Sequence, residues 1–187
     1  MPVDAVSTTK ASNNALLWLL KAGCTPEEAD AYGIRWHEQS ERLLIPVLNE
    51  QQELSGILAR ATNNERPKYK AFKNTQGIHF SSVPSASTVI VVEDILSSYA
   101  VRKAGFDSAA ILGTSISPED AHRLCNGRSR IVSFFDPDEA GRQGYVKLRK
   151  ALRLHPVSLF RAGAEHDPKY LSRSEIQQAV NLAVRKD

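Results

Sequence analysis

The segment Ile131–Arg142 reads IVSFFDPDEAGR, and it determines the fold that we predict for this chain. Its first five residues are β-branched or aromatic with one serine, a composition typical of a short buried strand. Asp136 and Asp138 follow directly, so they are expected at the carboxyl end of that strand. In α/β proteins, ligands bind at this end of a parallel sheet. The segment therefore predicts an acidic site at the rim of such a sheet.

A second apolar run ends in the same way. Residues 89–92 read VIVV and are followed by Glu93 and Asp94. Three or four carboxylates brought together repel one another, and a hard divalent cation such as Mg²⁺ relieves that repulsion. Because Mg²⁺ held by carboxylates commonly binds phosphates, the two runs favour metal-dependent chemistry on phosphate esters.

The sequence around these runs alternates between strand and helix patterns, which predicts βαβ units. We therefore expect an α/β fold whose main lobe is a mainly parallel sheet flanked by helices. The first part of the chain differs, because helical patterns there precede a pair of antiparallel strands at 42–48 and 54–60. It predicts a small α+β lobe. The expected domains are an N-terminal lobe at 13–82, a second lobe at 86–171 and a C-terminal helix at 172–187.

Composition excludes some classes of protein. No apolar run is long enough to span a bilayer, and residues 1–10 lack the pattern of an export signal, so we expect a cytoplasmic protein without a membrane partner. The two cysteines, Cys24 and Cys125, lie far apart and form no zinc-binding pattern, so no zinc is expected.

The net charge of +3 is only mildly basic, but basic residues are concentrated between Arg60 and Lys73. Aromatic residues are interleaved with them. This mixture suits a polyanion with stackable bases, such as single-stranded nucleic acid, and it also fits a solvated surface loop.

The acidic motifs resemble those of the Toprim domain, the metal-binding fold of primases, topoisomerases and some nucleases. The resemblance lies in the order of three features: Glu93 after one strand, residues 113–115 (GTS) after the next, and residues 136–141 (DPDEAG) after a third. It implies catalytic roles for Glu93, Asp136 and Asp138 and metal ligation by the same residues.

The first half extends the resemblance to the catalytic core of bacterial and phage replicative primases. Residues 42–47 (RLLIPV), 54–60 (LSGILAR) and 66–69 (RPKY) resemble motifs of that core, and residues 163–171 resemble its late Asp-Pro motif. The likeness covers about residues 13 to 175. It implies nucleotide or template contacts by a basic and aromatic set: Lys68, Arg60, Arg42, Lys70, Lys73 and Tyr69.

Two positions depart from the family pattern and leave the number of bound metal ions open. Asp94 stands where the family usually has glycine, and Ser97 stands where it often has an acid. Asp94 can supply part of the missing charge. Together with Asp167 of the late motif, it is a further candidate metal ligand.

The resemblance implies a DNA primase, a nucleotidyltransferase of DNA replication that uses Mg²⁺ or Mn²⁺ to make RNA primers from NTPs on single-stranded DNA. A Toprim nuclease and a non-catalytic nucleic-acid-binding subunit are the alternatives. Because the sequence has no zinc-binding module and no helicase region, we expect a phage or mobile-element protein. A separate helicase or zinc-module protein is its expected partner.

Overall fold

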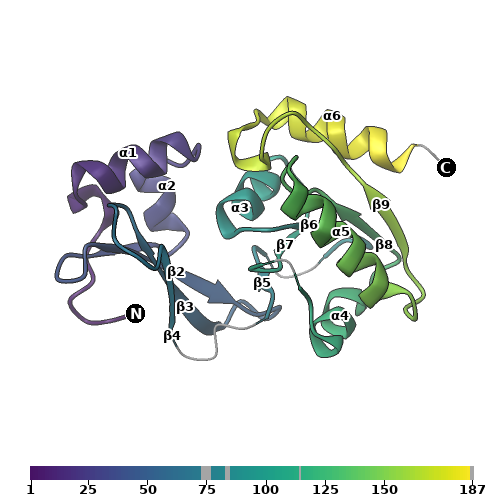
Figure 1. Cartoon of the computed structure of the whole chain (residues 1–187), viewed down its shortest axis with the longest axis horizontal. Helices are drawn as coiled ribbons and strands as arrows, with labels where there is room; N and C mark the ends of the chain where they lie inside the picture. Colours follow the sequence, from purple (N-terminus) through teal and green to yellow (C-terminus); the bar gives the residue numbers. More distant parts are fainter. Residues whose placement is uncertain (73–76, 83–84, 114, 186–187) are drawn as a thin grey trace. The chain divides into compact units, whose positions relative to one another are not determined.

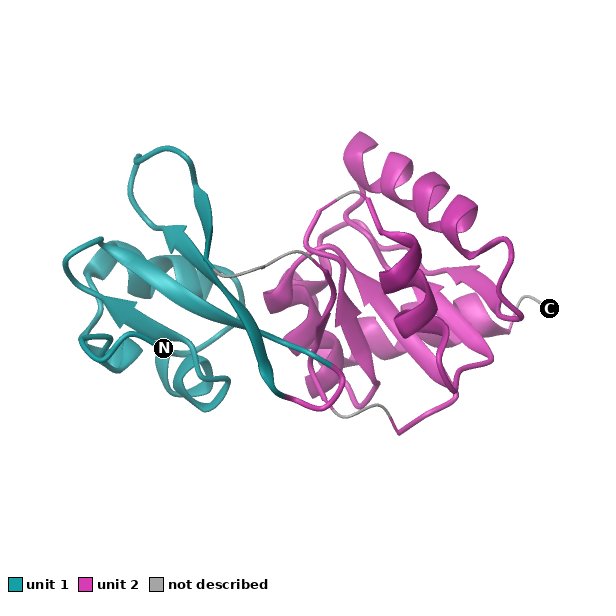
Figure 2. Ribbon diagram, turned by 90° about the horizontal axis from the view of Figure 1, so that it is seen from below, with its two compact units in different colours: residues 1–49, 53–76 teal, residues 50–52, 77–187 magenta. Residues whose placement is uncertain are grey.

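The computed structural model describes residues 1–72, 77–82, 85–113 and 115–185. Contacts divide the chain into two compact units (Figure 2). Unit 1 comprises residues 1–49 and 53–76, and unit 2 comprises residues 50–52 and 77–187.

Unit 1 is an antiparallel sheet with two short helices. Its strands follow one another in the order of the sequence, each paired with the next: β1 (Arg35–His37), β2 (Arg42–Leu48), β3 (Leu54–Ala61) and β4 (Tyr69–Phe72). The helices precede the sheet: α1 (Asn13–Lys21) and α2 (Pro26–Ala31). A 3-10 turn, η1 (Thr8–Lys10), lies before them. Helix α2 begins with a capping box, in which Thr25 and Glu28 each accept a hydrogen bond from the other's backbone N–H.

Unit 2 is a five-stranded sheet in the order β5-β7-β6-β8-β9, with only β5 antiparallel to its neighbour. The predicted mainly parallel sheet is therefore confirmed. Its strands are β5 (His79–Phe80), β6 (Thr88–Val92), β7 (Ser108–Ala110), β8 (Arg130–Ser133) and β9 (Ser158–Arg161). The helical elements are α3 (Ile95–Lys103), α4 (Pro118–Cys125), α5 (Glu139–Leu152), η2 (Pro168–Tyr170) and α6 (Arg173–Val184).

Helices cover both faces of this sheet (Figure 1). Alternate residues of the strands, such as Val89, Val91 and Ile131, pack with Leu124 of α4 and Leu148 of α5. Helices α3 and α6 contact each other and the strands from the opposite face. Because both faces are buried, the strands are continuous apolar runs instead of alternating ones, as the sequence suggested.

The unit boundaries differ in position from the domains expected from the sequence. Strand β5 pairs with β7 and so belongs to unit 2, whereas the expected first lobe extended to residue 82. Residues 83–84, in the expected gap between lobes, lie outside the described residues. Helix α6 packs on α3, β8 and β9, so it is part of unit 2 and not a separate C-terminal element.

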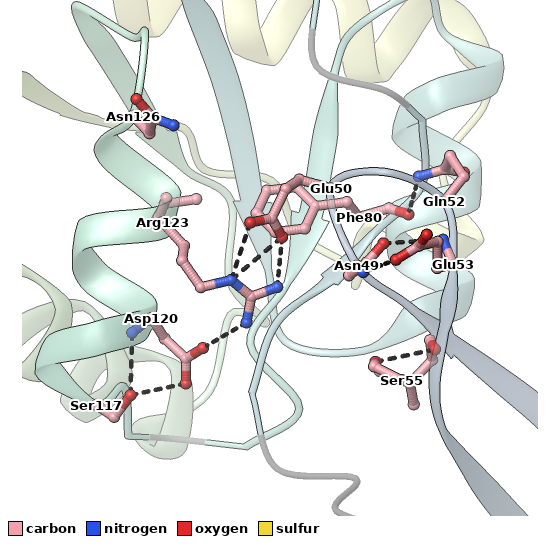
Figure 3. Close-up of polar contacts among 12 residues, drawn as sticks. Asn49, Glu50, Gln52, Glu53, Ser55, Phe80, Ser117, Asp120, Arg123 and Asn126 are labelled. Atoms are coloured by element: carbon pink, nitrogen blue, oxygen red, sulfur yellow. Dashed lines mark hydrogen bonds and ion pairs between the residues drawn. The ribbon is translucent and has the colours of Figure 1, made fainter.

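Residues 50–52, the turn between β2 and β3, also belong to unit 2, and Figure 3 shows the polar contacts of this turn. The Glu50 carboxylate accepts hydrogen bonds from the Arg123 guanidinium, which also pairs with Asp120. The Gln52 side chain donates to the Phe80 carbonyl oxygen over 3.0 Å. The sequence places this turn in the first lobe, because only tertiary contacts connect it to residues about 70 positions later.

No helix among the described residues is long and apolar enough to cross a bilayer.

Candidate active site

Sheet topology brings Glu93 and Asp136 together at one edge of unit 2. Strands β6 and β8 are adjacent and parallel, with Ile90 paired to Val132, so both end at the same edge. Glu93 follows β6, and one of its carboxylate oxygens accepts the backbone N–H of Asp136 over 3.0 Å. The two acids thus lie in direct contact although they are 43 residues apart.

Asp136 is partly buried, and its Oδ1 atom is fully buried without a hydrogen-bond partner among the described residues. A carboxylate oxygen in that state is costly unless a proton or a cation satisfies it. Burial raises the pKa of Asp136 to about 7; attraction by Lys169 opposes the rise, and repulsion by Asp167 and Glu93 adds to it. The group is therefore suited to exchange a proton for a cation near neutral pH.

Glu93 experiences the same environment. Burial, and then repulsion by Asp138, Asp94 and Asp167, raises the pKa of Glu93, while the hydrogen bond from the Asp136 N–H opposes the rise. Mutual repulsion among these carboxylates is the electrostatic signature expected of a cation-binding site.

Asp138 lies at the first turn of α5. It is the N-cap of that helix, and its Oδ1 atom accepts the backbone N–H of Gly141 over 2.8 Å. The residue is exposed. Because the helix N-terminus carries partial positive charge, it stabilises this carboxylate and orients it at the sheet edge.

Gly141 allows the strand end and the helix to approach closely. A Cβ atom at this position would collide with the carbonyl oxygen of Asp136 and lie 2.9 Å from a carboxylate oxygen of Glu93. The helix start can lie against the two acids only because residue 141 has no side chain. Gly141 is therefore a geometric requirement of the site.

Asp94 and Asp167 are engaged by a lysine. Asp94 caps α3 by accepting the N–H groups of Leu96 and Ser97, and its other oxygen accepts the Ser97 hydroxyl. The Lys169 ammonium donates to Asp94 over 3.0 Å and to Asp167 over 2.8 Å. Burial lowers the pKa of Lys169, but the attraction of Asp94 and the hydrogen bond to Asp167 outweigh it and hold the pKa above its usual value.

The acids do not form a closed metal cage. Within the part of the chain that the structure describes, no three histidine, cysteine, aspartate or glutamate side chains are placed to hold a metal ion. The contacts explain this, because Glu93 is turned to a backbone N–H, Asp138 to the helix start and Asp94 to Lys169. The donors and the unsatisfied Asp136 oxygen nevertheless fit a hard cation, which side-chain rotation would bring into contact with them.

In unit 1, Arg42 is 1% exposed, so this structure gives it no access to a nucleotide. Its guanidinium donates to the carbonyl oxygens of Ala59, Pro67 and Lys68 and pairs with Glu65 over 2.7 Å. A nucleotide contact was expected at this position, whereas the observed contacts are structural. Arg42 holds the backbone of the segment that carries Lys68.

Arg60 and Tyr69 form a stack on unit 1. The Arg60 guanidinium lies 4.7 Å from the Tyr69 ring centroid and 5.0 Å from the Trp18 ring centroid. Tyr69 is 44% exposed, so its ring is accessible while it packs against the arginine. An aromatic ring fixed by a cation on one side is a suitable surface for a nucleobase.

The lysines of the basic segment differ in their contacts. Lys68 is exposed, whereas Lys70 pairs with Glu65 over 3.0 Å. Lys73 lies outside the described residues. The exposed ammonium of Lys68 is therefore the better phosphate contact of the two described lysines.

The sequence did not indicate the role of Lys169, although it lies in the Asp-Pro-Lys run of the late motif. The only local signal was its nearness to Asp167, since the two residues lie at the start of the same 3-10 turn. Its contact with Asp94, 75 residues earlier, had no local signal.

Comparison with known proteins supports the assignment of the fold. The sequence profile of the Toprim domain matches residues 87–162. The DNA primase of Clostridium acetobutylicum is 27% identical over 161 residues, covering 78% of this chain and 26% of that protein. The DNA primase of Rickettsia prowazekii is 30% identical over 120 residues, covering 58% of this chain and 20% of that protein. The chain thus spans a fifth to about a quarter of the length of these relatives.

A solved structure shares the architecture. The zinc-binding and RNA polymerase domains of the Aquifex aeolicus primase superpose with a TM-score of 0.77 at 16% sequence identity. The superposition covers 95% of this chain and 57% of the Aquifex chain. Residues 87–162 of unit 2 therefore match the Toprim domain, and the chain has the fold of a primase catalytic core.

Proposed function

We propose that this chain, with its Toprim domain in the fold of a primase catalytic core, synthesises RNA primers on single-stranded DNA by nucleotidyl transfer. The observation that carries the proposal is the contact between Glu93 and Asp136 at the ends of two parallel strands, with Asp138 at the adjoining helix start. Sequence relatives that are DNA primases add support.

The three acids are proposed to hold Mg²⁺ or Mn²⁺. Both are hard cations that prefer oxygen donors, and the buried Asp136 Oδ1 atom has no other partner among the described residues. When bound, such a cation would stabilise the negative charge that develops around the reacting phosphate. The raised pKa of Asp136 implies that binding displaces a proton from this site near neutral pH.

The chain's own side chains divide the remaining tasks. Glu93 would either share the cation or take the proton from the attacking 3′-hydroxyl as a general base. In unit 1, Lys68 would contact phosphates and the Tyr69–Arg60 stack would contact a base. Arg42 would act indirectly, by fixing the backbone on which Lys68 lies.

The test is incubation of the protein with single-stranded DNA, labelled NTPs and Mg²⁺ or Mn²⁺. Template-dependent extension products are expected. Shortened DNA would instead indicate a Toprim nuclease, and binding without any product would indicate a non-catalytic subunit.

Asp138→Asn is the sharpest variant for this assay. Asparagine is as good an N-cap as aspartate, so α5 should remain intact while a cation ligand loses its charge. We expect Asp138→Asn and Asp136→Asn to lose extension activity, and to gain less thermal stability from added Mn²⁺ than the wild type does. Equal Mn²⁺-induced shifts in all three proteins would contradict the site assignment.

We further propose that a helicase or a zinc-binding module outside residues 1–187 supplies template selection. The two cysteines of the sequence do not form a zinc pattern. Starting a primer requires template and two nucleotides to be ordered at once, whereas a paired primer removes much of that entropic cost. We expect weak, unselective initiation by this chain and faster extension on primed templates; strong sequence-selective initiation would contradict the need for a partner.

A further inference from the structure

The Lys169 ammonium is placed as an internal cation at the acidic edge of unit 2. Its Nζ atom lies 3.0 Å from Asp94 Oδ2 and 2.8 Å from Asp167 Oδ2. Only 15% of the side chain is exposed, which is low for a lysine. Burying an ammonium is unfavourable unless partners compensate its charge, and here two carboxylates do so.

Both sides of this arrangement are held by secondary structure. Asp94 is fixed as the N-cap of α3 through the N–H groups of Leu96 and Ser97. Lys169 lies in η2, which packs against α3. A rotation of the Lys169 side chain away from this position would therefore break its contacts with both Asp94 and Asp167.

An ammonium and a divalent cation compete for the same carboxylate oxygens. With Lys169 in place, the combined charge of Asp94 and Asp167 is halved and one oxygen of each is occupied, so their attraction for a second cation is weaker. The Lys169 ammonium would also repel a divalent cation bound beside it. The repulsion is strong because the surrounding protein screens charges in a partly buried site less than water does.

We propose that Lys169 is a positioning residue that occupies Asp94 and Asp167 and so limits divalent cations to Glu93, Asp136 and Asp138. This inference rests on the proposed function, which assigns the cation to those three acids. Lys169 replaces a second metal ion with a fixed charge of the chain itself. The departure at Asp94 from the family pattern then serves the lysine and not a metal ion.

The experiment measures Mn²⁺ binding to the intact chain by electron paramagnetic resonance and isothermal titration calorimetry. Lys169→Met removes the charge and retains much of the side-chain volume. We expect one bound Mn²⁺ in the wild type, and in Lys169→Met either a second Mn²⁺ or at least a tenfold lower Kd. Lys150→Met, which removes an exposed lysine of α5, is the matched control and should behave as wild type.

Two further variants separate the charge from general effects on packing. Lys169→Arg keeps the positive charge and should retain the wild-type stoichiometry. The double variant Lys169→Met, Asp94→Asn should lose the gained Mn²⁺ binding, because one of the released carboxylates is gone. If Lys169→Met fails to fold, Lys169→Gln retains hydrogen-bond donors without the charge and takes its place.

The outcomes distinguish this inference from the proposed function. Wild-type Mn²⁺ binding that is unchanged in number and affinity in Lys169→Met would overturn the role of Lys169 alone. Mn²⁺ binding by Lys169→Met but not by the wild type would support that role and contradict metal binding by the three acids. Failure of every protein to bind Mn²⁺ would overturn both.

Discussion

At the scale of single residues, the acidic site depends on groups that carry no charge as much as on its carboxylates. Gly141 is the clearest case, because the space that a side chain would fill is taken by the Asp136 carbonyl oxygen and Glu93. The neighbouring glycine of α5, Gly144, has room: a Cβ there would lie 3.4 Å from the Phe135 ring, an ordinary contact. Two glycines three residues apart in one helix therefore have different physical roles.

We predict that Gly141→Ala destabilises unit 2 by about 2 kcal/mol and abolishes the Mn²⁺-induced thermal shift, since the helix start must move away from the two acids. Gly144→Ala is the control. It should be neutral or stabilising by up to ~1 kcal/mol, because alanine is the better helix former. Chemical denaturation with and without Mn²⁺ measures both quantities. A wild-type Mn²⁺ shift in Gly141→Ala would show that close approach at this position is unnecessary.

Arg42 illustrates how a buried basic residue can support a proposed binding surface from the interior. Its guanidinium binds three backbone carbonyl oxygens and Glu65, and it is 1% exposed. We predict that Arg42→Met destabilises unit 1 by about 3 kcal/mol, because three carbonyl oxygens lose a buried charged donor.

Arg66→Met provides the comparison for Arg42, since Arg66 is an exposed arginine of the same segment. It should change the free energy of unfolding by less than about 0.5 kcal/mol. Urea denaturation of both variants measures the difference. If the two variants unfold at the same urea concentration, Arg42 does not hold the segment in the way that we describe.

At the scale of elements, β5 shows how a two-residue strand can be held in a parallel sheet. It pairs antiparallel with β7, and both its residues are buried. The His79 ring lies edge-on to the Tyr99 ring of α3, with 5.4 Å between centroids. Burial, aided by the positive charge of Arg102, lowers the pKa of His79 from 6.5 to about 3.

This shift makes stability depend on pH. The unfolded chain binds a proton at His79 below about pH 6.5, whereas the folded chain does not do so until about pH 3. Acid therefore favours unfolding over that window, and stability decreases as the pH falls. His79 alone should lower the free energy of unfolding of unit 2 by about 2 kcal/mol as the pH falls from 7 to 5.

We predict that His79→Phe, which preserves a ring against Tyr99, removes this component, so that its stability falls less between pH 7 and pH 5 than that of the wild type. His166→Gln, at an exposed histidine, should leave the wild-type dependence unchanged. Thermal unfolding across the pH range checks both. Parallel pH profiles for wild type and His79→Phe would mean that His79 is not held neutral in the fold.

At the scale of the whole molecule, the two units carry different halves of the proposed activity. The carboxylates lie in unit 2, while the exposed Lys68 and the Tyr69–Arg60 stack lie in unit 1. A net charge of only +3 implies that nucleic-acid binding depends on where the basic residues lie more than on their total number.

We predict that Lys68→Ala weakens binding of single-stranded DNA. It should also make the negative slope of log affinity against log salt shallower by about 0.7, the value for one phosphate contact on a single strand. Lys21→Ala, at an exposed lysine of α1 in the same unit, should leave the slope unchanged. Fluorescence anisotropy at several salt concentrations measures it. Lys68→Ala should also retain the full Mn²⁺-induced thermal shift, and a reduced shift would contradict the division of tasks between the units.

The sequence by itself was sufficient for features that depend on neighbouring residues. The parallel sheet followed from apolar runs alternating with helical patterns, and the pairing of β2 with β3 followed from two strand patterns joined by a short turn. The contact between Glu93 and Asp136 was also predictable, because acids at the ends of parallel strands share one edge of the sheet. The roles of these acids in metal binding and catalysis stay predictions.

Only the tertiary structure decided which charged groups are buried and what they contact. The resemblance gave Arg42 and Lys68 the same expected role, yet one is interior and the other exposed. Likewise, the pairing of Lys169 with Asp94 and the assignment of residues 50–52 to unit 2 depend on residues more than 70 positions apart. Periodicity and capping act over a few residues, whereas burial and ion pairing are set by which elements pack together, so no local pattern could reveal them.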